Sequence, residues 1–308
     1  MDVKKFEIFL LCADHGSLTV AADVAGYTQS GVSHIIKNLE TEMGFPLLHR
    51  FHTGVAPTED AKRLIPTMRE LVSSNAQLEQ LAASIKGVET GVVRVGTFSS
   101  ISAHWMPGII KGYKAAHPNV DVQIISGGGR EIEEWIEHGR VDFGMCSVSA
   151  QSSFEWLPLA EDPYYAVLPL EHALASLDEF PIHAFHGLRF ISVPEGIHHE
   201  IHKLLRRYHV KPDYYYTNTD DLTLINMIEN GLGVGIFPKF VMRAYTHHAI
   251  KTIPLIPASS RLLGIALRSM KKAPPAVRSF LTYTKEAVET MLENDAVLEY
   301  AGRKERSL

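Results

Sequence analysis

The stretch that decides the fold is residues 16–50, GSLTVAADVAGYTQSGVSHIIKNLETEMGFPLLHR. Ser17 is suited to cap one helix, and Gly26 is suited to end it in the left-handed conformation. Thr28 is suited to cap the next helix, whose apolar residues recur at helical spacing on one face: Val32, Ile35, Ile36 and Leu39. Two short helices joined by a tight turn, then a hairpin, are typical of a DNA-reading head.

The opposite face of the second helix is polar. It carries Gln29, Ser30, Ser33, His34 and Lys37. A glutamine amide matches the edge of adenine, lysine and histidine can reach guanine acceptors or phosphates, and hydroxyls can bind phosphate oxygens. The alternative interpretation is the solvated face of an ordinary helix, which is the commoner outcome for a polar helix face taken singly.

The order of the whole segment resembles the winged helix-turn-helix of LysR-type transcriptional regulators. The residues that match the family pattern are Phe9, Gly16, Ser17, Leu18, Ala21, Ala22, Thr28, Gln29, Ser30, Val32, Ser33, Leu39, Glu40, Met43, Gly44, Leu47, Leu48, Arg50 and Thr58. Two positions depart from it: Ala61 stands where glycine is common, and His34 where arginine is frequent. Together with the polar face, the resemblance implies DNA contacts from Thr28, Gln29, Ser30, Ser33, His34, Lys37 and Arg50.

The same resemblance implies the domain organisation. An all-α winged helix-turn-helix with a long linker helix is expected before an α/β domain that resembles periplasmic binding proteins and has two subdomains. The expected boundaries are 1–58 for the DNA-binding domain, 59–87 for the linker helix and 88–308 for the effector-binding domain, with subdomain I at about 91–162 and 264–295 and subdomain II at about 163–263.

The linker segment carries an apolar ladder. From Ala61 to Ile85 these residues step alternately by three and four positions, which is typical of a coiled-coil seam. Thr58 is suited to cap the helix. The alternative is a helix that packs on its own domain. We expect a seam between two chains, with Asn75 fixing the register, and its residues are Leu64, Met68, Leu71, Asn75 and Leu78.

Strands and helices alternate after residue 87, which predicts a largely parallel sheet with helices on both faces. A single helix is expected at 101–117, and the chain is expected to cross between subdomains near 161–165 and 259–263. Loops at the carboxyl ends of parallel strands converge, and helix N-termini there attract anions. The expected site for a small anionic effector comprises Thr97, Ser99, Ser100, Gly127, Gly128, Pro194 and Asp220. Ordinary helix caps and a flexible turn are the alternative.

The length, composition and charge of the chain limit which classes of protein are possible. The chain has 308 residues, 45% of them hydrophobic, and lacks an uncharged apolar stretch of about 18 residues, so we expect no membrane span. Acidic residues near the N-terminus argue against a signal peptide, and we expect a cytoplasmic protein with Cys12 and Cys146 unpaired. Residues 1–58 contain four Lys and Arg against six Asp and Glu, a net charge of −2. Modest affinity for each head, and therefore an oligomer, is expected.

Two further classes of function stay open. His198 and His202 are four residues apart and could sense a metal, although two ligands make no complete site, so neither a metal nor another cofactor is predicted. An α/β enzyme or solute-binding protein with an appended helical domain is the other alternative, but no catalytic constellation is visible and we expect no enzyme. The expected partners are a double-stranded DNA operator, a small-molecule effector and further copies of the chain, as a homodimer that pairs into a tetramer, with RNA polymerase a further candidate.

Overall fold

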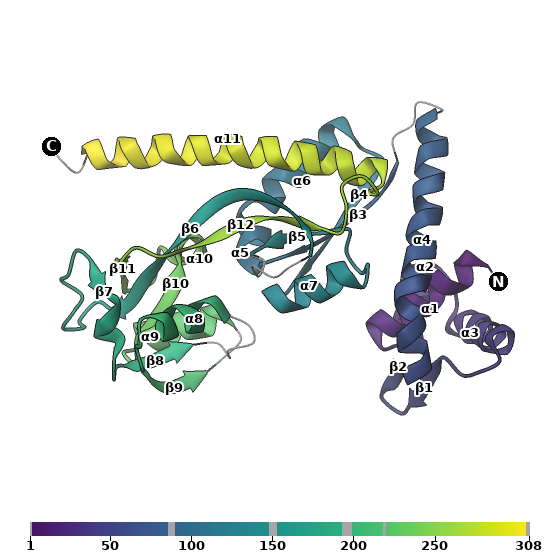
Figure 1. Ribbon diagram of the computed structural model, residues 1–308, viewed down its shortest axis with the longest axis horizontal. Coiled ribbons are helices and arrows are strands. Elements are labelled where there is room, and N and C mark those ends of the chain that lie inside the picture. Colours follow the sequence, from purple (N-terminus) through teal and green to yellow (C-terminus); the bar gives the residue numbers. More distant parts are fainter. Residues whose placement is uncertain (1, 86–89, 148–152, 193–198, 218–219, 306–308) are drawn as a thin grey trace.

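The N-terminal head is a three-helix unit with a wing. The computed structural model describes residues 2–85, 90–147, 153–192, 199–217 and 220–305. The head contains α1 (Val3–His15), α2 (Leu18–Ala25), α3 (Gln29–Met43), β1 (Leu48–Phe51) and β2 (Gly54–Pro57) (Figure 1). Ser17 and Thr28 accept hydrogen bonds from the amides of Val20 and Gly31, and Gly26 ends α2 with a φ of 70°. The predicted caps and the winged helix-turn-helix are confirmed.

The linker helix α4 (Glu59–Ile85) divides into two parts. Thr58 Oγ1 accepts from the Ala61 amide at 3.2 Å and caps the helix, as predicted. Met68 is only 3% exposed and packs with Leu64 in the core of the head, against α1. The assignment of Met68 to a seam between chains is therefore wrong, and Leu64 is half-buried in the same core, because the first part of the ladder faces its own domain.

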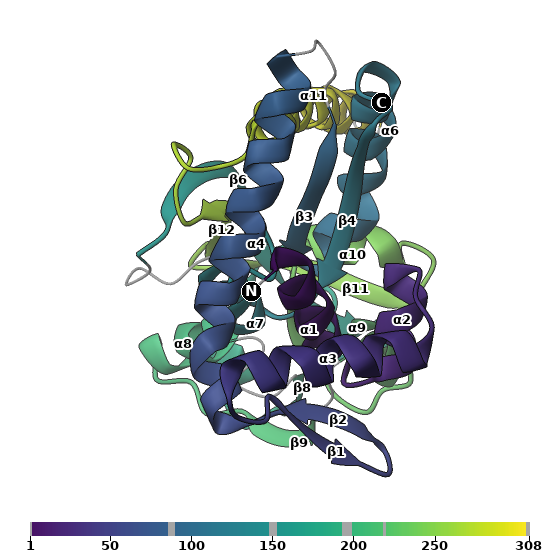
Figure 2. The same cartoon turned by 90° about the vertical axis from the view of Figure 1, so that its right-hand side faces the viewer.

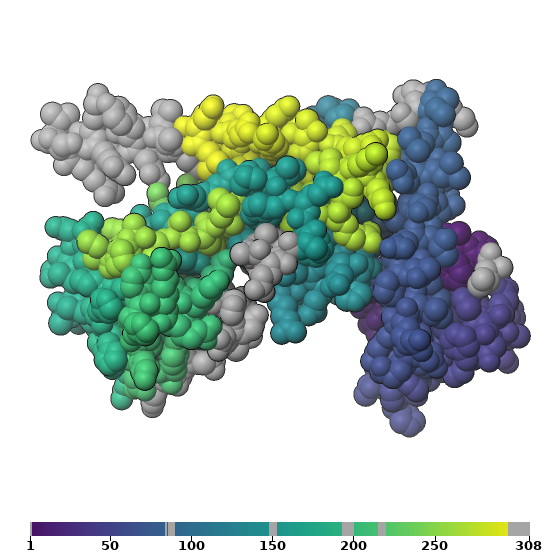
Figure 3. All heavy atoms as spheres, in the orientation of Figure 1, coloured from purple at the N-terminus to yellow at the C-terminus, as the bar shows by residue number. Residues whose placement is uncertain are grey.

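The second part of α4 carries an exposed apolar stripe. It comprises Leu71, Leu78, Leu81 and Ile85, of which Leu78 is 66% and Ile85 88% exposed. Asn75 donates to Glu79 on the same helix. On another side, Gln80 is buried and its Oε1 accepts from the amide of Ala276 at 3.2 Å, so α4 also touches the α/β domain. Figure 3 shows α4, in blue, bordered by the purple head and by the α/β domain.

The α/β domain has two subdomains that are joined by long strands. Its elements are β3 (Gly91–Thr97), α5 (Ser99–His104), α6 (Met106–Ala116), β4 (Val120–Ser126), α7 (Gly129–Glu137), β5 (Phe143–Cys146), β6 (Glu155–Pro169), β7 (Phe180–Pro181), the 3-10 helix η1 (Ile182–Phe185), β8 (Arg189–Ser192), α8 (His199–Arg207), β9 (Asp213–Thr217), α9 (Asp221–Glu229), β10 (Gly235–Pro238), α10 (Lys239–Met242), the 3-10 helix η2 (Arg243–Tyr245), β11 (Ile250–Ile256), β12 (Ser260–Leu267) and α11 (Pro275–Glu305). Figure 1 shows β6 and β12 running side by side between the two lobes, under α11.

The sheet is mixed, which corrects the prediction of a largely parallel one. Its strand order is β4-β3-β5-β12-β6-β11-β7, and β10 also pairs with β6. Only β4, β3 and β5, the pair β11 and β7, and the separate pair β8 and β9 run parallel among the named strands. β12 is antiparallel to both β5 and β6, because the chain returns to subdomain I beside the strand by which it left.

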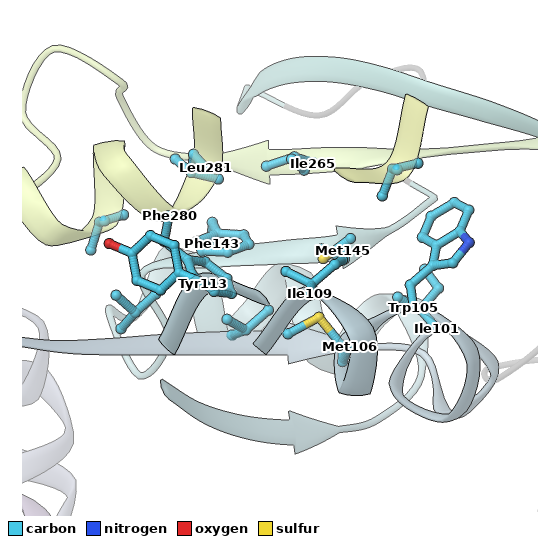
Figure 4. Close-up of a cluster of buried hydrophobic side chains, with 14 of the residues drawn as sticks. Ile101, Trp105, Met106, Ile109, Tyr113, Phe143, Met145, Ile265, Phe280 and Leu281 are labelled. Atoms are coloured by element: carbon cyan, nitrogen blue, oxygen red, sulfur yellow. The ribbon is translucent and has the colours of Figure 1, made fainter. Parts of the chain in front are cut away.

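The core of subdomain I lies between its sheet and α6 and α11. Figure 4 shows Tyr113, Phe143 and Phe280 packed together at one end of this core and Trp105 at the other. The single helix predicted at 101–117 is instead two, α5 and α6, which meet at Trp105. Pro107 explains the break, since its ring lacks an N–H and would clash within a continuous helix. Trp105 packs on Phe240 of subdomain II with ring centroids 4.8 Å apart.

Candidate DNA interface and effector site

The polar face of α3 is open. Val32, Ile36 and Leu39 are fully buried on the other side of this helix. Among the predicted contact residues of this helix and its cap, the exposed ones are Thr28, Gln29, Ser30, His34 and Lys37. An exposed row of amide, hydroxyl, imidazole and ammonium groups on a helix that follows a tight turn has the chemistry for reading a major groove.

Two predicted residues of the head contact each other. Arg50 of β1 donates from Nη1 to Ser33 Oγ of α3 at 3.1 Å, so half-buried Ser33 positions the arginine. Glu40 Oε1 accepts from the amides of Leu47 and Leu48 at 2.8 and 3.1 Å and fixes the start of the wing to α3. The family pattern includes Glu40 but gives it no role. The wing and the open face of α3 thus form one surface.

The loop after β3 supplies part of the candidate effector site. Thr97 is fully buried and its hydroxyl donates to the Phe98 carbonyl at 3.2 Å, so it shapes the loop and presents no free hydroxyl. Ser99 is exposed, and Ser100 is half-buried. The Ser100 hydroxyl faces Arg261 of β12, whose Nη2 lies 3.5 Å from Oγ.

Arg261 is a functional candidate that sequence reasoning missed. It is 8% exposed, and its Nε and Nη2 lie 3.0 and 2.9 Å from Asp162 Oδ2 on the crossing strand β6. The other Asp162 oxygen accepts from the amide of Phe240 in subdomain II at 2.8 Å. The guanidinium also lies over the Phe98 ring, 5.0 Å from its centroid. Arg261 therefore sits where the loop after β3 and both crossing strands meet.

Nearby carboxyl groups give this junction a mixed electrostatic character. Burial raises the pKa of Asp221, and the charge of Arg261 opposes that shift. Tyr164 of β6 donates to Glu200 Oε2 at 3.1 Å, and burial raises the pKa of the Tyr164 hydroxyl. A ligand at this place would meet hydrogen-bond donors and acceptors together.

The remaining predicted effector residues have structural partners of their own. A Cβ at Gly127 would lie 2.4 Å from the Trp135 ring, so this glycine permits close packing. The amide of Gly128 donates to Glu131 Oε2 at 2.8 Å. Asp220 caps α9 by accepting from the amides of Leu222 and Thr223, and the bonds from Thr223 lower its pKa. Pro194 lies outside the described residues.

The histidine pair is only partly visible. His198 lies outside the described residues. His202 has its Nε2 3.3 Å from Ser192 Oγ and its Nδ1 3.3 Å from Tyr214 Oη. Within the described ranges, His, Cys, Asp and Glu side chains form no group of three suited to hold a metal. Both ring nitrogens of His202 therefore have partners that a metal would have to displace.

The fold and these surfaces define a class: a DNA-binding head on a linker helix, followed by a two-subdomain effector-binding domain. Residues 3–62 match the family described as bacterial regulatory helix-turn-helix protein, lysR family, and residues 86–289 match the LysR substrate binding domain. The chain belongs to the LysR family of transcriptional regulators. In the described part of the chain, no helix is long and apolar enough to cross a membrane.

Similar proteins span nearly the whole chain. The uncharacterized HTH-type transcriptional regulator YvbU of Bacillus subtilis is 28% identical over 93% of this chain and 98% of that protein. A full-length OxyR variant from Pseudomonas aeruginosa superposes with a TM-score of 0.73 at 18% identity, covering 94% of each chain. Full-length CbnR complexed with its target DNA gives a TM-score of 0.64 at 16% identity, covering 93% of this chain and 100% of that one.

Proposed function

We propose that this regulator binds its operator as a dimer or tetramer and responds to a small anionic effector bound between the subdomains, beside Ser100 and Arg261. The observation that carries the effector class is the buried guanidinium of Arg261. Asp162 and Ser100 occupy its Nε and Nη2, and among the described residues nothing is bonded to Nη1. Arginine suits carboxylate and phosphate because it presents several donors in one plane.

The carboxylates near Arg261 restrict the chemical class of the effector further. Asp162 already offsets the charge of Arg261, and Asp221 lies within its electrostatic reach. An anion that also carries a hydroxyl or amine group fits this setting best, because it offers donors to Asp221 as well as an acceptor to Arg261. Such a ligand touches the loop after β3 and the crossing strands together, so binding would change the angle between the subdomains.

Replacing Ser100 by Ala tests the effector site. The change removes a hydroxyl worth about 0.5–1.5 kcal/mol to a bound ligand, so ligand affinity should fall roughly 2- to 12-fold while DNA affinity without ligand persists. A panel of small hydroxy acids, amino acids and phosphate esters, screened by thermal shift and then titrated, supplies the ligand. Ser99→Ala is the matched control, with a smaller loss expected.

Zinc is the probe for the metal alternative. A transcriptional response to Zn²⁺ that His202→Ala abolishes and Ser100→Ala leaves intact would favour metal sensing and contradict the anion site. The enzyme alternative has no support from the fold family, whose members regulate transcription.

Replacing Gln29 by Ala tests the reading face. Because Gln29 is exposed on α3, the protein should stay folded and lose about 1–3 kcal/mol of discrimination at one base pair of each half-site. Lys37→Ala should instead weaken binding to every sequence and flatten its salt dependence, as expected for a phosphate contact. Binding to all single-base variants of a site selected from random DNA is the measurement. Unchanged discrimination in Gln29→Ala would refute the assigned face.

A further inference from the structure

The wing ends in an exposed aromatic ring. Phe51 is the last residue of β1 and is 61% exposed. Its ring centroid lies 6.2 Å from that of His49, so the two rings share one side of the strand. Neither ring belongs to the core of the head, which takes only Leu48 from this strand. A large apolar side chain held in water at a hairpin tip is available for a contact with a partner, and its place beside α3 decides which partner it meets.

The wing tip is fixed in place by the end of α1. Phe51 pairs across the hairpin with Gly54. Gly54 has a φ of 147°, and a Cβ there would lie 2.3 Å from the Gly16 carbonyl oxygen. The same oxygen accepts from the Val55 amide at 2.8 Å. The backbone that carries Phe51 is therefore positioned before any partner binds.

The tip continues the surface formed by α3. Arg50 precedes Phe51, and its side chain, on the other side of the strand from the Phe51 ring, is bonded to Ser33 and ties the base of the tip to α3. Figure 2 shows the hairpin β1–β2 extending below α3 at the lower end of the head. A DNA duplex whose major groove receives α3 would therefore place its adjacent minor groove at the wing tip. This continuity selects DNA as the occupant of the Phe51 surface.

The net charge of the head also favours an apolar contact with DNA. Residues 1–58 have a net charge of −2, and Arg50 is the only Lys or Arg of the hairpin. Phosphate contacts alone then give each head little affinity. Minor-groove-binding proteins insert apolar side chains such as Phe between base steps and kink the duplex, a contact that needs no positive charge. Sequence preference then arises from how easily the contacted step unstacks.

We propose that Phe51 is an apolar wedge that enters the minor groove beside each half-site, bends the operator and selects flexible base steps. The proposal rests on the DNA-binding function above and adds to it a source of affinity that does not depend on salt. Phe51 would contribute by deforming the duplex, whereas Gln29 would contact a base edge and Lys37 a phosphate.

The test is Phe51→Ala in the full chain, with Phe51→Leu as the matched control because leucine also serves as a wedge. The probe is a duplex of the site selected from random DNA, with dyes at its ends to measure bending and 2-aminopurine at the flanking steps to report unstacking. Phe51→Ala should lose the bend and the 2-aminopurine signal and bind about 5- to 20-fold more weakly, with an unchanged salt slope. Phe51→Leu should retain most of each effect, and the melting temperature should not move.

Several results would overturn the wedge. Wild-type bending and affinity in Phe51→Ala would do so, and so would a change in sedimentation, which would show that the ring faces another chain. A flattened salt slope would mean that the ring only positions Arg50. If the wild-type chain fails to prefer the selected site at all, the regulatory function fails with it, and that outcome is distinct because it does not depend on residue 51.

Discussion

Replacing both Leu71 and Leu78 by Asp is expected to convert the protein to monomers and to reduce operator affinity by about 10²–10⁴-fold, the advantage that linking two binding heads confers. Leu78 is 66% exposed and Leu71 47% exposed in the single chain, yet both lie on a long helix that holds the head. In the proposed dimer two such stripes would bury each other, and four carboxylates placed between them would be unpaired and desolvated.

The head should survive this change, because it packs on a different side of α4. Ala61 and Met68 are buried in the core of the head, whereas Leu71 and Leu78 are exposed, so the double variant should retain the helical content and melting behaviour of the head. Sedimentation velocity measures the assembly, and Leu71→Met with Leu78→Met is the control that keeps the stripe apolar. An intact dimer in the Asp variant would show that the exposed stripe does not join the chains.

Sequence reasoning succeeded where the determining interactions are local. Ser17, Thr28 and Thr58 were predicted as caps and act as caps, because a capping side chain bonds to an amide within three residues. The ladder of α4 shows the limit of such reasoning. A repeat of three and four residues identifies an apolar face, but it does not say whether that face meets another chain or, as at Met68, the same domain.

In the effector domain, the functional residue that the sequence did not reveal depends on contacts between residues far apart in the chain. Arg261 lies in a segment that was expected only as a crossing point, and no local pattern links it to Asp162 or Ser100. Gly127 and Gly128, predicted as effector residues, also have local structural roles. Gly127 accommodates Trp135, and the spacing from Gly128 to Glu131 already carried the sign of a helix start, where a glutamate bonds the cap amide.

Replacing Arg261 by Met is expected to destabilise the effector domain by about 3–5 kcal/mol, because it leaves a buried carboxylate without its charged partner. Asp162 is only 4% exposed and would keep one bond, from the Phe240 amide. For a domain of this size the loss corresponds to roughly 6–20 °C in melting temperature. Calorimetry of the full chain measures it, with the head transition as internal reference.

The double variant Arg261→Met with Asp162→Asn separates the two roles of the arginine. Removing both charges should recover most of the stability, since an apolar side chain beside a neutral amide avoids the uncompensated charge. The response to an anionic ligand should stay absent, because the guanidinium donors are gone from both variants. Recovery of stability together with recovery of the response would mean that Arg261 only stabilises the junction and that the anion binds elsewhere. Stability recovered without the response would instead establish the guanidinium as the group that holds the effector.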